Sequence, residues 1–353
     1  MQGNTPILEV NDLKTHFFLE EGVVRAVDGV SFQMKRGSVT GVVGESGCGK
    51  SVLARSIMRI VRPPGQSFEG QILYNRHDSS NAIPDAAANQ LNLRELNLDG
   101  PEMREIRGSE IAMVFQEPMV CFSPVHTVGA QIIEAIRLHQ DVDKDQARAQ
   151  AIDMLRKVGI PDADRNIDSY VFNLSGGMRQ RCMIAMALSC NPSLLIADEP
   201  TTALDVTTQA QIMRLMADLQ SEFGMAMMLI THNLGVIAQM AEDVIVMYLG
   251  KIVEHTDVKT LFRDPKHPYT QELLKSIPRL NRTGQTERLA AIAGNVPSPF
   301  AIPSGCPFRT RCPQYMPGTC DVIEPQLTEV GPNHTASCLL YSDGSGAASG
   351  DSS

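Results

Sequence analysis

The stretch Gly44-Glu45-Ser46-Gly47-Cys48-Gly49-Lys50-Ser51 decides the fold of this chain. It matches the pattern G-x-x-x-x-G-K-[ST], in which backbone N–H groups surround phosphates, the lysine reaches the β- and γ-phosphates and the last hydroxyl ligates Mg²⁺. A β-branched run at 39–43 precedes it, and a helix-like run at 51–60 follows it. A chance glycine-rich turn is the alternative, but the strand-loop-helix context favours a phosphate-binding loop. The sequence therefore predicts a nucleoside triphosphate site.

The composition sets the outer limits. The 353 residues are enough for about two domains, and 43% hydrophobic residues can build real cores. No run of about 18 apolar residues and no signal-peptide pattern is present, so we expect a cytosolic chain without a membrane span. The formal net charge of −9 argues against nonspecific nucleic-acid binding. The 8 cysteines are not expected to form disulfides in a reducing compartment, so a cluster of them indicates metal binding or catalysis.

The first part of the chain alternates in the manner of strands. Residues 7–18 and 23–34 show this pattern, with Glu20-Glu21-Gly22 as the turn between them. Phe17 or Phe18 could stack on an adenine ring from the first strand. An ordinary place in the core is the alternative for each.

A polar insertion and a group of helices follow the phosphate loop. Residues 75–100 are polar without clear periodicity, which is typical of a surface insertion that is ordered only in part. A partner-contact element is the alternative. Residues 128–139 and 144–158 have the pattern of amphipathic helices, so we expect a helical subdomain at about 117–190.

A second glycine-rich segment, Leu174-Ser175-Gly176-Gly177-Met178, precedes a helix expected over 178–190. A hydroxyl, bare N–H groups and the positive end of a helix together suit an anion. An ordinary helix N-cap is the alternative. The position of the segment between the phosphate loop and the acidic strand that follows favours the anion.

The apolar run at 194–199 ends in two acids, Asp198 and Glu199. Paired carboxylates at the end of a buried strand are costly without a cation. We expect Asp198 to hold Mg²⁺ and Glu199 to polarise a water in line with the γ-phosphate. A tight turn that ends at Asp205 then leads into another helix.

Two further polar residues follow predicted strands. Gln116 comes after the strand at 111–115 and can ligate Mg²⁺ or position water. His232 comes after the strand at 225–231 and could hydrogen-bond the γ-phosphate. Each is weak evidence alone, because polar residues before a proline or at a strand end are common.

Taken together, these motifs resemble those of the nucleotide-binding subunit of an ABC transporter over residues 7–260. The resemblance implies an α/β P-loop NTPase fold, with a RecA-like core, an antiparallel β-subdomain and a helical subdomain. It implies ATP and Mg²⁺ as cofactors, with Ser51, Gln116 and Asp198 around the metal. Glu199 would drive hydrolysis, and His232 would contact the γ-phosphate.

The resemblance also implies a dimer. Two such subunits face each other head to tail in this family, so the segment from Leu174 to Met178 would complete the nucleotide site of the partner subunit. Asp205 would lie in a dimer loop, and the Gln116 region would meet a membrane subunit. Met178 departs from the glutamine that usually ends the segment, but Ser175 and its glycines remain.

The C-terminal part narrows the family. His267-Pro268-Tyr269-Thr270 resembles an element of the oligopeptide and dipeptide importer ATPases. This branch implies two membrane permeases, an external solute-binding protein and a paralogous second ATPase, with the chain peripheral on the cytoplasmic face of the inner membrane. Peptides are the expected solute, and nickel, opines and oligosaccharides are the alternatives. The expected divisions are a nucleotide-binding domain at 1–260, a small cysteine-rich C-terminal domain at 261–341 and a disordered tail at 342–353.

Four cysteines gather after residue 300 among prolines and glycines: Cys306, Cys312, Cys320 and Cys338. A loop-rich region with so little apolar periodicity predicts a metal-nucleated fold, and four unrelated thiols are the alternative. Their spacing fits zinc poorly, because zinc usually favours paired C-x₂₋₄-C ligands. The oligopeptide branch carries a C-terminal cysteine motif that holds a [4Fe-4S] cluster, so the resemblance implies that cluster, with Zn²⁺ as the alternative.

Two other classes of function stay in view. A soluble ABC ATPase that acts on DNA or ribosomes would predict a long coiled-coil insertion or two cassettes in tandem, and the sequence has neither. A redox or regulatory module with a vestigial ATPase is opposed by the intact Lys50, Asp198 and Glu199. Within the phosphate loop, the positive field around Cys48 predicts a lowered thiol pKa and easy oxidation.

Overall fold

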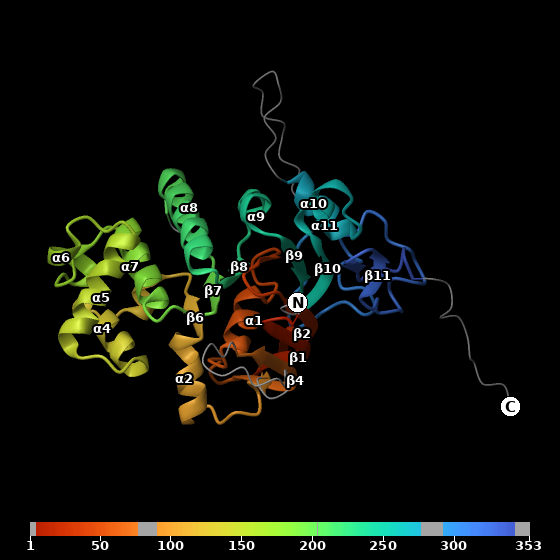
Figure 1. Cartoon of the computed structure of the whole chain (residues 1–353). Coiled ribbons are helices and arrows are strands. Elements are labelled where there is room, and N and C mark those ends of the chain that lie inside the picture. Colours follow the sequence, from red (N-terminus) through yellow and green to blue (C-terminus); the bar gives the residue numbers. More distant parts are fainter. Residues whose placement is uncertain (1–4, 77–89, 203, 277–291, 343–353) are drawn as a thin grey trace, which may run out of the picture.

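The computed structural model describes residues 5–76, 90–202, 204–276 and 292–342, which Figure 1 shows in colour. We refer to residues 292–342 as the C-terminal segment. The strands are β1 (Leu8–Leu19), β2 (Gly22–Met34), β3 (Val39–Val43), β4 (Gly65–Asn75), β5 (Gln90–Asn92), β6 (Ile111–Val114), β7 (Leu194–Asp198), β8 (Ala226–Ile230), β9 (Asp243–Tyr248), β10 (Lys251–Asp257), β11 (Thr328–Gly331) and β12 (His334–Ala336). The helices are α1 (Lys50–Ile57), α2 (Pro101–Ser109), α3 (Pro118–Cys121), α4 (Val128–His139), α5 (Lys144–Lys157), α6 (Ala163–Asn166), α7 (Gly176–Leu188), α8 (Val206–Phe223), α9 (Leu234–Met240), α10 (Val258–Arg263) and α11 (Pro268–Lys275), with a 3₁₀ turn at Val171–Asn173.

The larger sheet has the strand order β11-β12-β10-β9-β3-β8-β7-β6. The strands from β9 to β6 are parallel, and β10, β12 and β11 continue the sheet antiparallel. Every residue of β3, β7 and β8 is buried, as expected for strands covered on both faces. The phosphate loop follows β3 and Asp198 ends β7, so both lie at the carboxyl edge of the sheet, where open α/β sheets bind ligands.

The smaller, antiparallel sheet has the order β2-β1-β4-β5. β1 and β2 form the predicted hairpin, in which Leu19 pairs with Gly22 and Phe17 with Val24. β5 pairs with β4, and Leu93 after it is fully buried. This part of the predicted surface insertion therefore belongs to the sheet. Its apolar side chains are buried there. Residues 77–89 of the insertion lie outside the described residues.

The helical subdomain predicted at about 117–190 forms a lobe that contains α4, α5 and α7, on the left of Figure 1. α4 has the predicted bounds, and Thr127 caps it by accepting a hydrogen bond from the Ala130 N–H. Asp143 caps α5 in a capping box with Gln146. α7 begins two residues before the predicted start, because Ser175 supplies its N-cap.

The C-terminal segment joins the larger sheet through one buried carboxylate. Glu254 of β10 is fully buried and accepts the backbone N–H of Lys266 at 2.7 Å and that of His267 at 2.9 Å. Its Oε1 also lies 2.8 Å from Nε2 of His334, on β12. The strand β12 also pairs with β10, across the domain boundary predicted at residue 260. That boundary stays a prediction. Of the predicted tail, residues 343–353 lie outside the described residues.

The burial of His267 is expected to make the C-terminal part of the fold sensitive to acid. Burial lowers the pKa of its imidazole to about 3, and Nδ1 accepts the Tyr269 N–H at 3.0 Å. The unfolded chain protonates this residue near pH 6.5, so its contribution to the free energy of unfolding is complete above that pH and is lost as the pH falls from about 6.5 towards 3.

We expect the loss to reach about 1.4 kcal/mol per pH unit within that window. His267→Asn keeps an acceptor at the N-cap but does not titrate, so its unfolding free energy should fall less steeply. Urea denaturation of both proteins at pH 7 and pH 5 measures the difference. If the free energy of unfolding fell equally between pH 7 and pH 5 in the two proteins, this role of His267 would be contradicted.

Candidate nucleotide-binding site

The phosphate loop curls between β3 and α1 and presses against the smaller sheet. Gly49 has φ +105°, and a Cβ atom there would overlap the carbonyl oxygen of Ala26 on β2, so glycine is required. Lys50 is buried, and its Nζ donates to the carbonyl oxygens of Gly44 at 2.8 Å and Glu45 at 3.0 Å. The ammonium group therefore lies within the curve of the loop, where the sequence predicts phosphate.

Ser51 and Asp198 meet beside the loop. The Ser51 hydroxyl donates to Oδ1 of Asp198 at 2.8 Å, and Asp198 is 1% exposed. Burial raises the pKa of the Asp198 carboxyl, so a nearby cation would stabilise its charged form. Mg²⁺ usually takes one or two protein carboxylates together with phosphate oxygens and water. This pair of oxygen atoms fits that ligand set.

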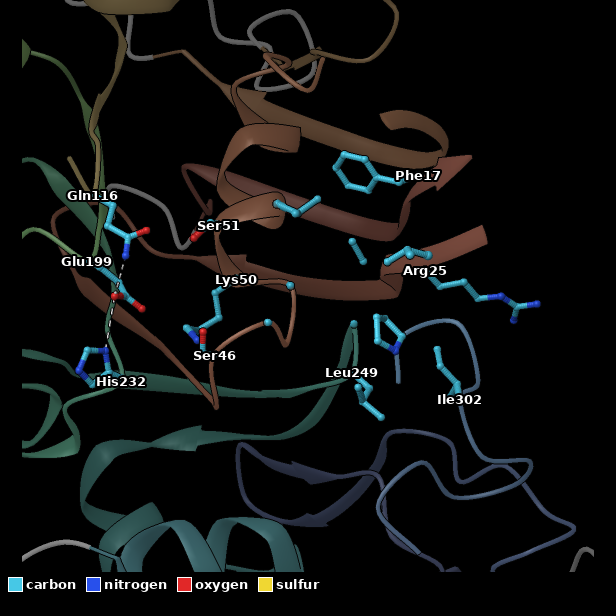
Figure 2. Close-up of a pocket in the computed structure, with 17 residues that line it drawn as sticks. Phe17, Arg25, Ser46, Lys50, Ser51, Gln116, Glu199, His232, Leu249 and Ile302 are labelled. Carbon is cyan, nitrogen blue, oxygen red and sulfur yellow. Dashed lines mark hydrogen bonds and ion pairs between the residues drawn. The ribbon is translucent and has the colours of Figure 1, made fainter. Parts of the chain in front are cut away.

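Glu199 is held by three polar neighbours at the end of β7. Its backbone has φ +46°, a conformation that non-glycine residues adopt at a cost. The carboxylate accepts the Thr202 hydroxyl at 2.9 Å and Nε2 of Gln116 at 3.4 Å. Nδ1 of His232 lies 3.5 Å from the same oxygen, and Figure 2 shows Gln116, Glu199 and His232 converging. The structure thus brings together the three residues that the sequence placed at separate strand ends.

A cavity of about 670 Å³ extends from the phosphate loop to β1. The residues at its polar end are Ser46, Gly47, Gly49, Lys50, Ser51, Gln116, Glu199 and His232. The apolar residues at its other end are Phe17, Val24, Leu249, Pro299 and Ile302, and Arg25 also lies at that end. A polar end beside an apolar end suits a phosphorylated aromatic molecule.

Phe17 and Phe18 are separated by their positions on β1. Phe17 lines the cavity, whereas Phe18 is 50% exposed and lies beside Phe68, with 6.3 Å between ring centroids. A Cβ atom on Gly65 would lie 2.6 Å from the Phe17 ring, so this glycine makes room for the ring. Of the two candidates for adenine stacking, Phe17 is the one that lines the cavity, and its contact with adenine stays a prediction.

The glycine-rich segment at 174–178 lies away from this cavity. Leu174 is buried, and the Ser175 hydroxyl accepts the Met178 N–H at 3.3 Å at the start of α7. Figure 1 places α7 in the helical lobe, apart from α1. Asp205 caps α8 by accepting the Thr208 N–H at 2.9 Å and the Thr208 hydroxyl at 2.7 Å. The roles of both elements in a partner subunit stay predictions.

The expectation of an activated Cys48 thiol is wrong. Cys48 is 4% exposed, and burial raises the pKa of its thiol despite the opposing charge of Lys50. The thiolate is the reactive form, so peroxide should oxidise this residue slowly. We expect Cys48→Ser to leave the peroxide sensitivity of ATP hydrolysis unchanged, measured after graded peroxide treatment of both proteins. A more resistant variant would contradict this.

Two residues from outside the cassette motifs hold the phosphate loop. Arg311 is paired with Glu45 through two contacts, Nη1 to Oε2 at 2.6 Å and Nη2 to Oε1 at 2.9 Å, and its side chain is 3% exposed. The Tyr269 hydroxyl accepts the Glu45 N–H at 2.8 Å. Tyr269 stands in the His-Pro-Tyr-Thr motif, whereas Arg311 lies between two cysteines without any local pattern of its own, so its role is not readable from the sequence.

The four C-terminal cysteines are all free, and Cys320 is buried while the other three are half-buried. The pKa of the Cys306 thiol is raised to about 11, first by burial and then by the charges of the other three. Within the described part of the chain, no group of three or more His, Cys, Asp or Glu side chains could hold a metal ion. The described side chains thus do not show a formed metal site, and the cluster stays a prediction.

Comparison with known proteins decides the family. The family model of the ABC transporter matches residues 27–202, and that of the C-terminal region of oligopeptide/dipeptide transporters matches residues 253–320. A probable peptide ABC transporter ATP-binding protein of Sinorhizobium fredii is 49% identical, over 94% of this chain and 94% of its own. This chain belongs to the ABC transporter ATP-binding proteins. Other ABC proteins similar to it include the oligopeptide transport protein AppD of Bacillus subtilis, 45% identical over 96% of this chain and 97% of its own. The dipeptide transport protein DppD of Escherichia coli is 43% identical over 96% and 98%.

Solved ABC structures share the fold. The dimeric structure of a bacterial ABC transporter cassette has a TM-score of 0.59 and 25% identity, over 71% of this chain and 98% of that one. An ABC transporter protein of Clostridium perfringens, cbiO1, has a TM-score of 0.56 and 25% identity, over 73% and 91%. These similarities confirm the predicted P-loop NTPase fold. None of the helices that the structure describes is long and apolar enough to cross a membrane.

Proposed function

We propose that this chain is the ATP-hydrolysing subunit of an ABC importer for peptides. The observation that supports this most is the meeting of Lys50, Ser51 and Glu199 in one cavity, in a chain that resembles peptide transport proteins over 94% to 96% of its length. Nickel, an opine or an oligosaccharide is the alternative solute, since the described cavity would take the nucleotide and not the cargo.

Each polar residue of the cavity has a role in this proposal. Lys50 and the N–H groups of its loop bind the β- and γ-phosphates of ATP. Mg²⁺, held by Ser51, Asp198 and Gln116, would neutralise charge on the phosphates. Glu199 accepts the proton of the attacking water, and the hydrogen bonds from Thr202 and Gln116 orient its carboxylate.

The remaining roles concern the γ-phosphate and the partner subunit. The His232 side chain is 66% exposed and contacts the γ-phosphate from the open side of the cavity. The segment from Leu174 to Met178 completes the site of a second cassette, and Asp205 lies at the contact between the two. The segment from Leu174 to Met178 lies at the N-terminus of α7, outside the cavity of its own chain, and this position supports the arrangement.

We infer that the second cassette is a paralogue of this chain. Two permeases and an external solute-binding protein complete the importer, and this chain lies against the permeases on the cytoplasmic face of the inner membrane. The names of the relatives, which describe ATP-binding proteins of peptide transport, support the permeases and the solute-binding protein as partners.

Affinity purification from mild-detergent extracts tests this function. We expect mass spectrometry of the tagged full chain to find two permeases and a second ABC ATPase, and the purified complex to hydrolyse ATP. A Lys50→Ala chain should assemble equally well but lose hydrolysis, which separates assembly from catalysis. Recovery with ribosomes or DNA and without any membrane protein would overturn the importer.

We also propose that residues 261–341 form a small domain whose four cysteines, Cys306, Cys312, Cys320 and Cys338, hold a [4Fe-4S] cluster. The donor set of four free thiols suits such a cluster, and the mutual influence of the thiols on the pKa of Cys306 supports their proximity. Zn²⁺ is the alternative. When bound, the cluster would either take part in electron transfer or crosslink the loops that carry the four cysteines.

Metal analysis of anaerobically purified protein tests the cluster. We expect iron and acid-labile sulfide in wild-type protein, and their loss in Cys306→Ser. The control is Cys190→Ser, because Cys190 is a half-buried cysteine near α4. This variant should keep both the iron and the sulfide. One zinc per chain without iron or sulfide would replace the cluster with the alternative metal.

A further inference from the structure

The nucleotide cavity has a second wall that no sequence motif marks. At the end away from the phosphate loop, Phe17 of β1 lies on one side, and Leu249 and Ile302 lie on the opposite side (Figure 2). Pro299 lines the cavity as well. Leu249 belongs to the turn between β9 and β10, whereas Pro299 and Ile302 belong to the C-terminal segment.

A turn holds Pro299 and Ile302 at this place. The Ala301 N–H donates to the carbonyl oxygen of Ser298 at 2.9 Å, and the Phe300 N–H donates to the hydroxyl of Ser298 at 3.3 Å. The Phe300 ring packs beside the hairpin of β1 and β2, where a Cβ atom on Gly22 would lie 3.4 Å from it. The turn therefore rests on the same sheet that carries Phe17.

The residues after this turn are tied to the cysteine-bearing part of the segment. The Ser304 hydroxyl donates to the carbonyl oxygen of Asp321 at 2.9 Å, and the Cys306 N–H donates to that of Cys320 at 2.8 Å. Nε of Arg309 donates to the carbonyl oxygen of Ser304 at 2.9 Å. These bonds fix the turn from its C-terminal side, so the position of Ile302 is set from both directions.

We propose that Pro299 and Ile302 bind the base of ATP from the face opposite Phe17. Once the phosphate loop holds the triphosphate, the connected nucleoside must extend towards the apolar end of the cavity. Base stacking on an aromatic ring contributes to binding through one face, and the apolar atoms of Ile302 and Pro299 cover the other. Ile302 is half-buried, which leaves part of its side chain free for this contact. The inference rests on the proposed binding of ATP and makes the C-terminal segment part of the ATP site.

Truncating Ile302 should weaken the binding of ATP but not of a ligand without a base. We expect Ile302→Ala to raise the dissociation constant of ATP about fivefold and Ile302→Asn about tenfold, because both lose apolar contact with the base. Inorganic tripolyphosphate should bind the wild-type chain and both variants equally. Ile323→Ala removes an exposed isoleucine of the same segment that does not line the cavity, so it should change neither affinity. Isothermal titration calorimetry with the full chain measures all these constants.

The outcomes separate this inference from the function on which it rests. Unchanged ATP affinity in both Ile302 variants would overturn the inference and leave the proposed function intact. An equal loss of ATP and tripolyphosphate affinity would also overturn it, because the effect would then lie at the phosphates. A wild-type chain that binds neither ligand would overturn the proposed function and this inference together.

Discussion

Glu199→Gln is expected to lower ATP turnover about a thousandfold while leaving the dissociation constant of ATP within about threefold of wild type. Glutamine keeps the shape of the side chain and can still receive the Thr202 hydroxyl, but its amide cannot accept the proton of the attacking water. Single-turnover hydrolysis and equilibrium binding measure the two effects separately. Slow hydrolysis should also leave ATP bound for longer at the site.

Glu222→Gln is the matched control. It makes the same chemical change on α8, where the carboxylate lies 3.1 Å from Nζ of Lys157 on the surface. Exposed pairs of this kind contribute little to stability, so turnover should stay at the wild-type rate. Normal hydrolysis by Glu199→Gln would remove this residue from its proposed role and favour a different base.

Arg311→Met is expected to lower the free energy of unfolding by about 3 kcal/mol and to weaken ATP binding. Methionine fills much of the same volume but leaves the Glu45 carboxylate, 24% exposed, without its paired cation. The loop then loses its link to the C-terminal segment at Glu45 and keeps the Tyr269 contact with the Glu45 N–H, which should loosen the N–H groups that face phosphate. Chemical denaturation and calorimetric titration with ATP measure the two losses.

A second substitution distinguishes the ion pair from general packing. Adding Glu45→Gln to Arg311→Met removes the unpaired charge, so the double variant should recover part of the lost unfolding free energy. Arg309→Met is the control. Among the described residues the Arg309 guanidinium donates only to Ser304, near the surface, so its loss should cost less than about 1 kcal/mol. Strictly additive losses in the double variant would show that the two side chains do not interact.

The sequence allowed most of the polar end of the site to be predicted because each residue there follows a local signal. The phosphate loop has its own spacing, and Asp198, Glu199 and His232 each come at the end of an apolar strand. Parallel strands bring their carboxyl ends to one edge, so the meeting of these residues follows from the fold class. The order of the strands, with β3 between β9 and β8, is not readable from the chain, because it depends on which buried strands pair.

Apart from Phe17, the apolar end of the site was not predictable in this way, and neither was the support of the phosphate loop. Arg311 and Glu45 are 266 positions apart, and neither stands in a pattern that indicates the other. Ile302 and Pro299 lie in a stretch without helical or strand periodicity, so no pattern in the sequence indicates that they face Phe17 across the cavity. Contacts of this kind are set by how distant segments pack.

The pairing of β12 with β10 also determines how much of the chain can be removed. Without the C-terminal hairpin, β10 would be the last strand of the larger sheet and would present unpaired N–H and C=O groups along one side. Bare edges of this kind pair readily with other chains and promote aggregation. A fragment that ends near residue 260 would therefore be a poor substitute for the whole protein in solution, since it would expose backbone groups of β10 that β12 pairs in the intact chain.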